Sequence, residues 1–174
     1  RHWSLDARAP FLGSFTHPSG ALNLSVTSPK DRLSRFLVHL DAIFEKEPEF
    51  FPFESTLPGA GKVVCMVYRD LPEPGSITGI TYGLSEVAHP DWVHGRPELC
   101  ISVDSTDIAW ALAAGEIVNE LRGKCPFNYG DVINFREPIS DESGMSALFV
   151  FAPSILERAD YLNVDVGGGG RSRR

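Results

Sequence analysis

The chain has 174 residues, of which 43% are hydrophobic and 22% are charged, and its formal net charge is −7. This length and composition are typical of one folded soluble domain. An acidic chain lacks the basic surface that binds a nucleic-acid backbone or an anionic membrane, so neither is expected as its main partner. No apolar run approaches the ~20 residues that span a bilayer, and no signal-peptide pattern stands at the start.

The three cysteines, Cys65, Cys100 and Cys125, are far apart in the sequence and form no CxxC pair. This spacing argues against a disulfide framework and against a zinc ribbon. Cys65 and Cys100 lie within apolar, strand-like runs, where a small buried thiol is the expected role. The pattern therefore predicts a reducing, cytoplasmic setting. No cofactor is expected, and no metal site is assigned, with the Glu86–His94 loop as the alternative considered below.

The N-terminal part divides into an irregular segment and a helix. Residues 1–27 carry scattered apolar side chains among prolines and glycines without a sustained period, which predicts a loosely attached leader that docks by its aromatics. A helix is then expected, with Ser28 as N-cap, Pro29 at the first helical position and Pro48 as its stop. Apolar residues recur along it at helical spacing and form one face: Leu33, Phe36, Leu37, Leu40, Ile43 and Phe44.

An aromatic-rich connector and a strand follow. In residues 48–61 the aromatic side chains are expected to cover the edge of the core, the alternative being an exposed partner site. Residues 63–68 form a continuous apolar run, which predicts a strand covered on both faces. Residues 69–75 are rich in proline and glycine and predict a turn.

The central stretch runs from Ile77 to Val103. Residues 77–84 are of the β type but are interrupted by Gly79 and Gly83, a pattern that marks a bulge or a close approach by other backbone. Residues 98–103 alternate between apolar and polar side chains and predict a half-buried strand. The intervening loop is long for a hairpin and carries most of the candidate metal ligands.

The C-terminal half predicts a second helix and further strands. The helix is expected to be capped by Asp104 or Ser105, to end near Gly123 and to lie buried on a sheet, because its apolar stripe is wide. Strands are predicted over residues 132–135, 148–151 (buried) and 161–166, and residues 167–174 read as a flexible Gly/Arg tail. These elements define an α+β domain over residues 28–166.

Motifs that carry chemistry are weak in this chain. Ser85 lacks the G-x-S-x-G context of a nucleophile elbow, and the glycines before Lys62 lack the spacing of a phosphate loop. The Glu86–His94 loop holds four residues of metal-ligand type in a spacing that matches no established metal pattern: Glu86, His89, Asp91 and His94. The alternative is a polar loop with a packed Trp92 and solvated histidines.

Several short motifs nevertheless occur in a characteristic order. They are Thr81-Tyr82-Gly83-Leu84-Ser85-Glu86, a loop with a tryptophan, Arg96-Pro97-Glu98-Leu99, a Trp-containing helix, and Gly130-Asp131 before a strand with a Pro138 turn. In this order they resemble the Suppressor of fused (SUFU-like) domain family, over about Leu33 to Val166 and best over residues 80–153. The single-domain form resembles the bacterial members of the family.

The resemblance implies an α/β sandwich with a mixed, largely antiparallel sheet and flanking helices. In the animal family member, a peptide of a Gli transcription factor is held largely as an added β-strand. Of the animal peptide-binding residues, the aspartate that follows a glycine corresponds to Asp131, and a tyrosine twelve residues earlier corresponds to Asn119. For Asp131, the interpretation from its sequence position alone is a turn cap or a partner contact.

Three functional hypotheses follow. The first is a non-enzymatic protein-binding module, as in the bacterial members that are suggested to be immunity proteins against toxins. An acidic chain suits a basic toxin, because opposite charges steer association. The second is a metal-binding domain or metal-dependent enzyme that uses the Glu86–His94 loop. The third is a regulator that binds a transcription-factor peptide through Asp131. The oligomeric state is left open.

Overall fold

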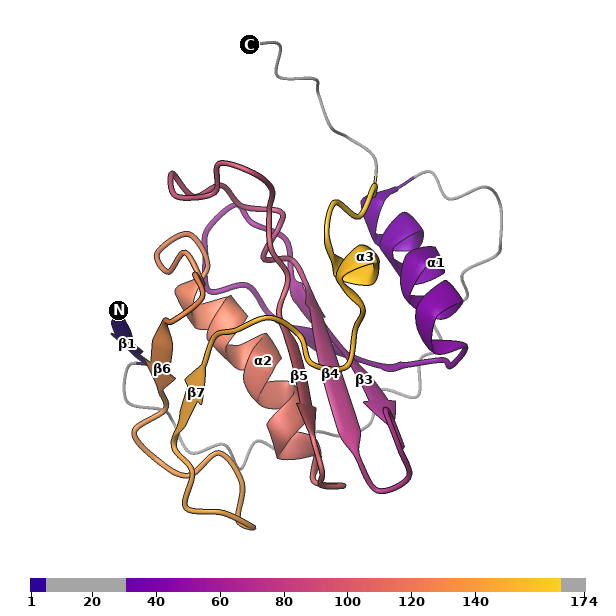
Figure 1. The fold of residues 1–174 in the computed structure, drawn as a ribbon. Helices are drawn as coiled ribbons and strands as arrows, with labels where there is room; N and C mark the ends of the chain where they lie inside the picture. Colours follow the sequence, from indigo (N-terminus) through magenta and orange to yellow (C-terminus); the bar gives the residue numbers. More distant parts are fainter. Residues whose placement is uncertain (6–30, 167–174) are drawn as a thin grey trace.

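The computed structural model describes residues 1–5 and 31–166 and places them in an α+β sandwich of two sheets and three helices (Figure 1). The α+β class predicted from the sequence is thus confirmed, with two sheets in place of one. The elements are β1 (His2–Ser4), α1 (Arg32–Phe44), β2 (Glu49–Phe53), β3 (Val63–Arg69), β4 (Ile77–Tyr82), β5 (Cys100–Val103), α2 (Ile108–Leu121), β6 (Val132–Asn134), β7 (Ala147–Phe149) and α3 (Arg158–Tyr161).

The larger sheet is fully antiparallel and has the order β2-β3-β4-β5. Alternate residues of β3 point to opposite faces. Val63, Cys65 and Val67 enter the core shared with α2, whereas Met66 and Tyr68 enter a second core beneath α1. The continuous apolar run of β3 therefore reflects burial on both faces, as its pattern predicts.

Helix α2 lies between the two sheets and is buried along most of its length. It approaches the larger sheet closely, because small residues face each other at the contact. A Cβ atom at Gly79 of β4 would lie 2.7 Å from the carbonyl oxygen of Ala111, and one at Gly115 would lie 2.4 Å from Cε2 of Phe53. Of the two readings of Gly79, bulge or close approach, close approach is the one observed.

Helix α1 covers the opposite face of the larger sheet, and α3 lies beside it (Figure 1). The N-cap of α1 is Asp31, whose carboxylate accepts the Ser34 N–H at 2.8 Å. The predicted cap Ser28 and Pro29 lie outside the described residues. Helix α3 is tied to α1 by a 2.6 Å hydrogen bond between His39 Nε2 and the Asp160 carbonyl. In the described ranges, no helix has the length and apolarity needed to cross a membrane.

The smaller sheet has the order β1-β6-β7, with β1 parallel and β7 antiparallel to the central β6. The prediction of a loosely attached leader is wrong for the first five residues. Trp3 pairs with Ile133 and packs against the core, and Leu5 is fully buried. A strand this short has too few residues to display a period. Residues 6–27 of the predicted leader and the predicted tail, 167–174, lie outside the described residues.

Three other local predictions need correction. The connector over 48–61 contains β2, which tolerates Pro52 because it is an edge strand and can dispense with an N–H. Helix α2 is capped by Asp107, whose carboxylate accepts the Ala109 N–H at 3.0 Å, and not by Asp104 or Ser105. The predicted strand 161–166 is absent. Glu157 and Asp160 instead form a capping box that starts α3.

Candidate interaction surface

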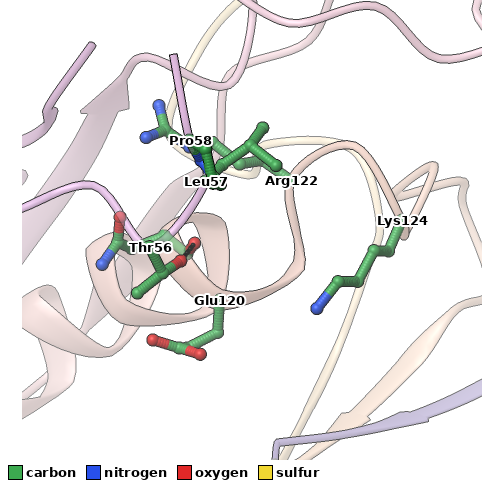
Figure 2. A pocket seen from close by; sticks show the side chains of 7 residues that line it. Thr56, Leu57, Pro58, Glu120, Arg122 and Lys124 are labelled. Carbon is green, nitrogen blue, oxygen red and sulfur yellow. Dashed lines mark hydrogen bonds between the residues drawn. The ribbon is translucent and has the colours of Figure 1, made fainter. Parts of the chain in front are cut away.

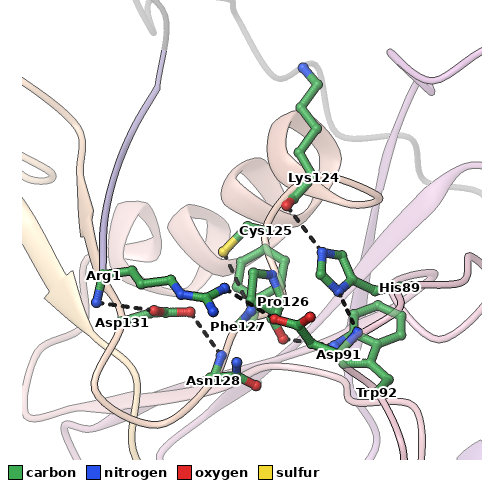
Figure 3. Close-up of polar contacts among 10 residues, drawn as sticks. All are labelled: Arg1, His89, Asp91, Trp92, Lys124, Cys125, Pro126, Phe127, Asn128 and Asp131. Atoms are coloured by element: carbon green, nitrogen blue, oxygen red, sulfur yellow. Dashed lines mark hydrogen bonds and ion pairs between the residues drawn. The ribbon is translucent and has the colours of Figure 1, made fainter.

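The loop that carries the candidate metal ligands is fastened to the segment after α2 (Figure 3). Trp92 donates its indole N–H to the Pro126 carbonyl at 2.7 Å, and His89 Nε2 lies 3.2 Å from the Lys124 carbonyl. Asp91 forms an ion pair with Arg1 at 3.0 Å, and Glu86 accepts the Tyr82 hydroxyl. Glu86, His89 and Asp91 thus have separate partners, and His94 is exposed on the same loop. Nowhere in the described chain do three such residues gather in a way that would hold a metal ion.

Asp131 has the turn-capping role, one of the two roles considered for it. Its side chain is 2% exposed, and Oδ2 accepts the Asn128 N–H at 2.9 Å (Figure 3). Its own N–H donates to the Asn128 carbonyl at 3.0 Å, which closes the turn that leads into β6. The amino nitrogen of Arg1 lies 3.4 Å from Oδ1. These contacts enclose the carboxylate within the fold.

Asn119 lies on α2 and faces a different segment from Asp131. Its Nδ2 donates to the Glu54 carbonyl at 2.9 Å, and its carbonyl accepts the Thr56 hydroxyl at 2.6 Å. The side chain is 8% exposed, and its Oδ1 has no partner in the described structure. No hydrogen bond within the described chain joins Asn119 to Asp131. The structure therefore does not unite the two residues that the family resemblance singles out.

Asn119 lines a cavity of about 260 Å³ at the C-terminal end of α2 (Figure 2). The other lining residues are Thr56, Leu57, Pro58, Glu120, Arg122 and Lys124. Glu120 and Lys124 bring one charge of each sign to its rim. Arg122 is 1% exposed, and its guanidinium donates to the carbonyls of Gly61 and Gly83 and to the Ser55 hydroxyl. The cationic group that lines the cavity is therefore largely occupied by the fold.

The motifs that carry the family resemblance meet at the Glu98 carboxylate. Oε1 accepts the N–H groups of Gly83 and Ser85 at 2.9 and 3.0 Å and the Ser85 hydroxyl at 2.7 Å. Oε2 accepts the Thr81 hydroxyl at 2.8 Å and the Leu84 N–H at 3.3 Å. Burial raises the pKa of Glu98, while these hydrogen bonds act to lower it. Glu98 therefore fixes the turn after β4 and has no free lone pair for a ligand.

The three cysteine thiols are free and unreactive in character. Burial raises the pKa of Cys65 and of Cys100 to about 12, and that of Cys125 to about 11. Since the thiolate is the nucleophile and the metal ligand, these groups are poor candidates for either role at neutral pH. The Cys65 thiol instead donates to the Ala111 carbonyl at 3.2 Å and serves the packing of α2.

An exposed aromatic patch lies at β7, which the sequence predicted to be buried. We call it the β7 patch; it consists of Tyr129, Phe149 and Phe151, which are 66%, 57% and 61% exposed. The rings of Phe149 and Phe151 stack with centroids 6.3 Å apart. Leu148 and Val150, which alternate with them, pack against the core. The sequence of β7 shows no alternation between apolar and polar residues, because both of its faces carry apolar side chains.

The β7 patch adjoins an open sheet edge. Among the described residues, strand β7 pairs with β6 on one side and with no strand on the other (Figure 1). The Ser146 carbonyl and both polar groups of Val150 bond toward β6, so the groups of Ala147, Phe149 and Phe151 point away from it. Within the described chain these outward groups have no backbone partner. No charged residue occurs in residues 143–156, so this edge lacks the charges that usually protect one.

Comparison of the chain with protein-family models, with curated proteins and with solved structures gives no match.

Proposed function

We propose that the protein is a non-enzymatic protein-binding module of the Suppressor of fused type. The observation that supports this most is the β7 patch beside an unpaired, uncharged strand edge. Exposed aromatic residues are enriched among the side chains that dominate binding energy. An open edge supplies main-chain hydrogen bonds to an added strand. Together they offer affinity through backbone and selectivity through side chains.

The partner class that we propose first is a toxin that the module neutralises as an immunity protein in a bacterial cytoplasm. The net charge of −7 favours encounter with a basic protein. The three thiols without a disulfide are compatible with a reducing compartment. These properties bear on the rate and the setting of association, while the β7 patch supplies the contact itself.

A regulator that holds a transcription-factor peptide through Asp131 receives less support from the geometry. The Asp131 carboxylate is enclosed and bonded to the turn at Asn128. A peptide could reach it only after that turn opened. The metal-binding hypothesis is likewise less favoured, because Glu86, His89 and Asp91 of the Glu86–His94 loop have separate partners.

The test is capture of a partner from the source cells, followed by reconstitution with the purified partner in calorimetry. We expect Phe149→Ser to weaken the measured affinity about ten-fold or more, as expected for truncation of an aromatic hot spot. Val93→Ser is the matched control, since Val93 is 79% exposed on the loop before β5. Equal affinities for the two variants would exclude the β7 patch, and no partner in any capture would refute the binding module.

A further inference from the structure

We propose that the open edge of β7 pairs with β7 of a second copy of this chain, in antiparallel orientation about a two-fold axis. The smaller sheets of the two copies, with three strands each, would then join into one continuous sheet. A closed two-fold dimer uses the same patch on both copies and leaves neither β7 edge exposed. The dimer follows from the edge itself, while its regulatory consequence rests on the proposed function.

The hydrogen-bonding pattern restricts this pairing to one register. The outward-pointing residues are Ala147, Phe149 and Phe151, so a two-fold axis at Phe149 pairs Phe149 with its own copy and Ala147 with Phe151. An axis at Val150 would bring Pro153 opposite Ala147, and an axis at Phe151 would bring it opposite Phe149; proline has no N–H to donate. The register centred on Phe149 keeps every outward group paired.

The registers on the other side are blocked by existing bonds. An axis at Leu148 would pair Met145 with Phe151, and an axis at Ala147 would pair it with Phe149. The Met145 N–H already donates to the Ser143 hydroxyl at 3.1 Å, and its carbonyl accepts the Ile139 N–H at 2.9 Å. Either register would break the bonds that shape the turn before β7. The centred register needs no such change.

Side chains also match across the centred register. Phe149 faces Phe149 on the outer side of the sheet, an aromatic cross-strand pair. Small Ala147 faces large Phe151, and on the inner side Leu148 meets Val150, which extends the apolar core across the axis. At roughly 200 Å² per ring and the exposures above, Phe149 and Phe151 of two copies expose roughly 470 Å². With the backbone edge, the contact has the size of a weak, reversible interface, below ~1,200 Å².

The charge distribution favours a second copy over a basic strand at this edge. Each chain carries −7, so two copies repel each other wherever their acidic residues approach. The pairing segment has no charged residue between positions 143 and 156. A basic strand would meet no acidic residue in this segment and so would gain no ion pair. An uncharged strand forms the same backbone hydrogen bonds without needing one. In the absence of a partner, the dimer would therefore occlude the surface that the proposed function uses.

The experiment is sedimentation velocity of the full chain over micromolar to near-millimolar concentrations. We expect a reversible monomer–dimer equilibrium that tightens as salt is added, because salt screens the repulsion between acidic copies. Phe149→Lys places a charge on the two-fold axis opposite its own copy and should weaken dimerisation about ten-fold or more. Val93→Lys makes the same charge change on the distant loop and should leave the equilibrium unchanged.

A charge-swap rescue separates this geometry from a general loss of folding. Phe149→Lys and Phe149→Glu should each be monomeric alone and should form a one-to-one heterodimer when mixed, since position 149 faces itself. Circular dichroism serves as the control that both variants are folded. A wild-type chain that remains monomeric throughout, or a dimer that Phe149→Lys leaves intact, would overturn the proposal. Because these measurements use the purified chain alone, their result is independent of whether a partner protein is captured.

Discussion

Replacement of Glu98 by glutamine is the most direct test of whether its carboxylate holds the turn after β4 in place. Glutamine keeps the size of the side chain and one acceptor oxygen, but it exchanges the other oxygen for an amide nitrogen. If the oxygen takes the Oε1 position, it retains the N–H groups of Gly83 and Ser85. The nitrogen then faces the Leu84 N–H and the Thr81 hydroxyl, which both donate to Oε2 in the wild type.

The cost can be worked from these contacts. The Thr81 hydroxyl already accepts the Leu99 N–H at 2.8 Å, so it has limited freedom to reverse its role. An amide that loses its only acceptor costs about 1–3 kcal/mol, and the remaining hydrogen bonds lose the strengthening that a charged acceptor gives. We therefore expect Glu98→Gln to lower the free energy of unfolding by about 2 kcal/mol. Glu98→Ala removes the acceptor for three amides and should cost about 4 kcal/mol or more.

The assay is urea denaturation followed by circular dichroism, with the midpoint and slope compared among variants. Glu73→Gln is the matched control, because Glu73 is exposed in the turn between β3 and β4 and should change stability by less than ~0.5 kcal/mol. A Glu98→Gln variant as stable as this control would refute the view that Glu98 organises the turn after β4.

Two further predictions concern the contact between α2 and the larger sheet. Gly79→Ala should lower the free energy of unfolding by about 2–3 kcal/mol through overpacking, since the new Cβ would lie 2.7 Å from the Ala111 carbonyl oxygen; Gly61→Ala, with no atom within 4 Å of its Cβ, should be neutral in the same urea titration, and equal effects would contradict the close approach. The raised pKa of Cys65, about 12 against 9.0, means that the unfolded thiol ionises first as the pH rises, so this thiol should remove up to about 1.4 kcal/mol of stability per pH unit above pH 9. Denaturation between pH 8 and 11 should therefore show a shallower loss for Cys65→Ser, and parallel curves would contradict the assignment.

The central elements could be predicted because local pattern and tertiary burial agree there. Strand β3 is apolar on both faces and is covered on both, and the wide apolar stripe of α2 reflects its position between two sheets. Gly79 left two interpretations open, a bulge or a close approach by other backbone, and the structure shows the close approach. In these places one arrangement satisfied every local preference.

The errors fall where tertiary context outweighs the local pattern. Strand β1 pairs in parallel with β6, which lies far along the chain. A pattern read over a short stretch of sequence cannot detect so distant a pairing. Of the predicted strand 161–166, only Tyr161 lies in α3, which the capping box of Glu157 and Asp160 starts, and residues 162–166 belong to no strand. In β7, Phe149 and Leu148 are equally apolar, so only the fold decides which of them is exposed.

The surroundings of the candidate site residues could not be predicted for a related reason. Residue type proposed Asp131 and the histidine-bearing loop, since carboxylates and imidazoles are chemically versatile. In the structure, Asp131 is hydrogen-bonded within a turn, and His89 and Trp92 are hydrogen-bonded to the chain after α2. A sequence does not show whether a polar atom already has an internal partner, and this determines whether it can meet a ligand.

Internal hydrogen bonds and burial also separate the residues that stabilise the fold from those that can contact a partner. Glu98 and Arg122 bond to opposite ends of Gly83, to its N–H and its carbonyl. Arg122 is buried and Glu98 is half-buried. Substitution at either position should therefore act on stability before it acts on binding. Phe149 has the opposite character, since it is exposed and contributes little to the core. A partner of the proposed binding module is therefore to be sought from the chemistry of residues 143–156.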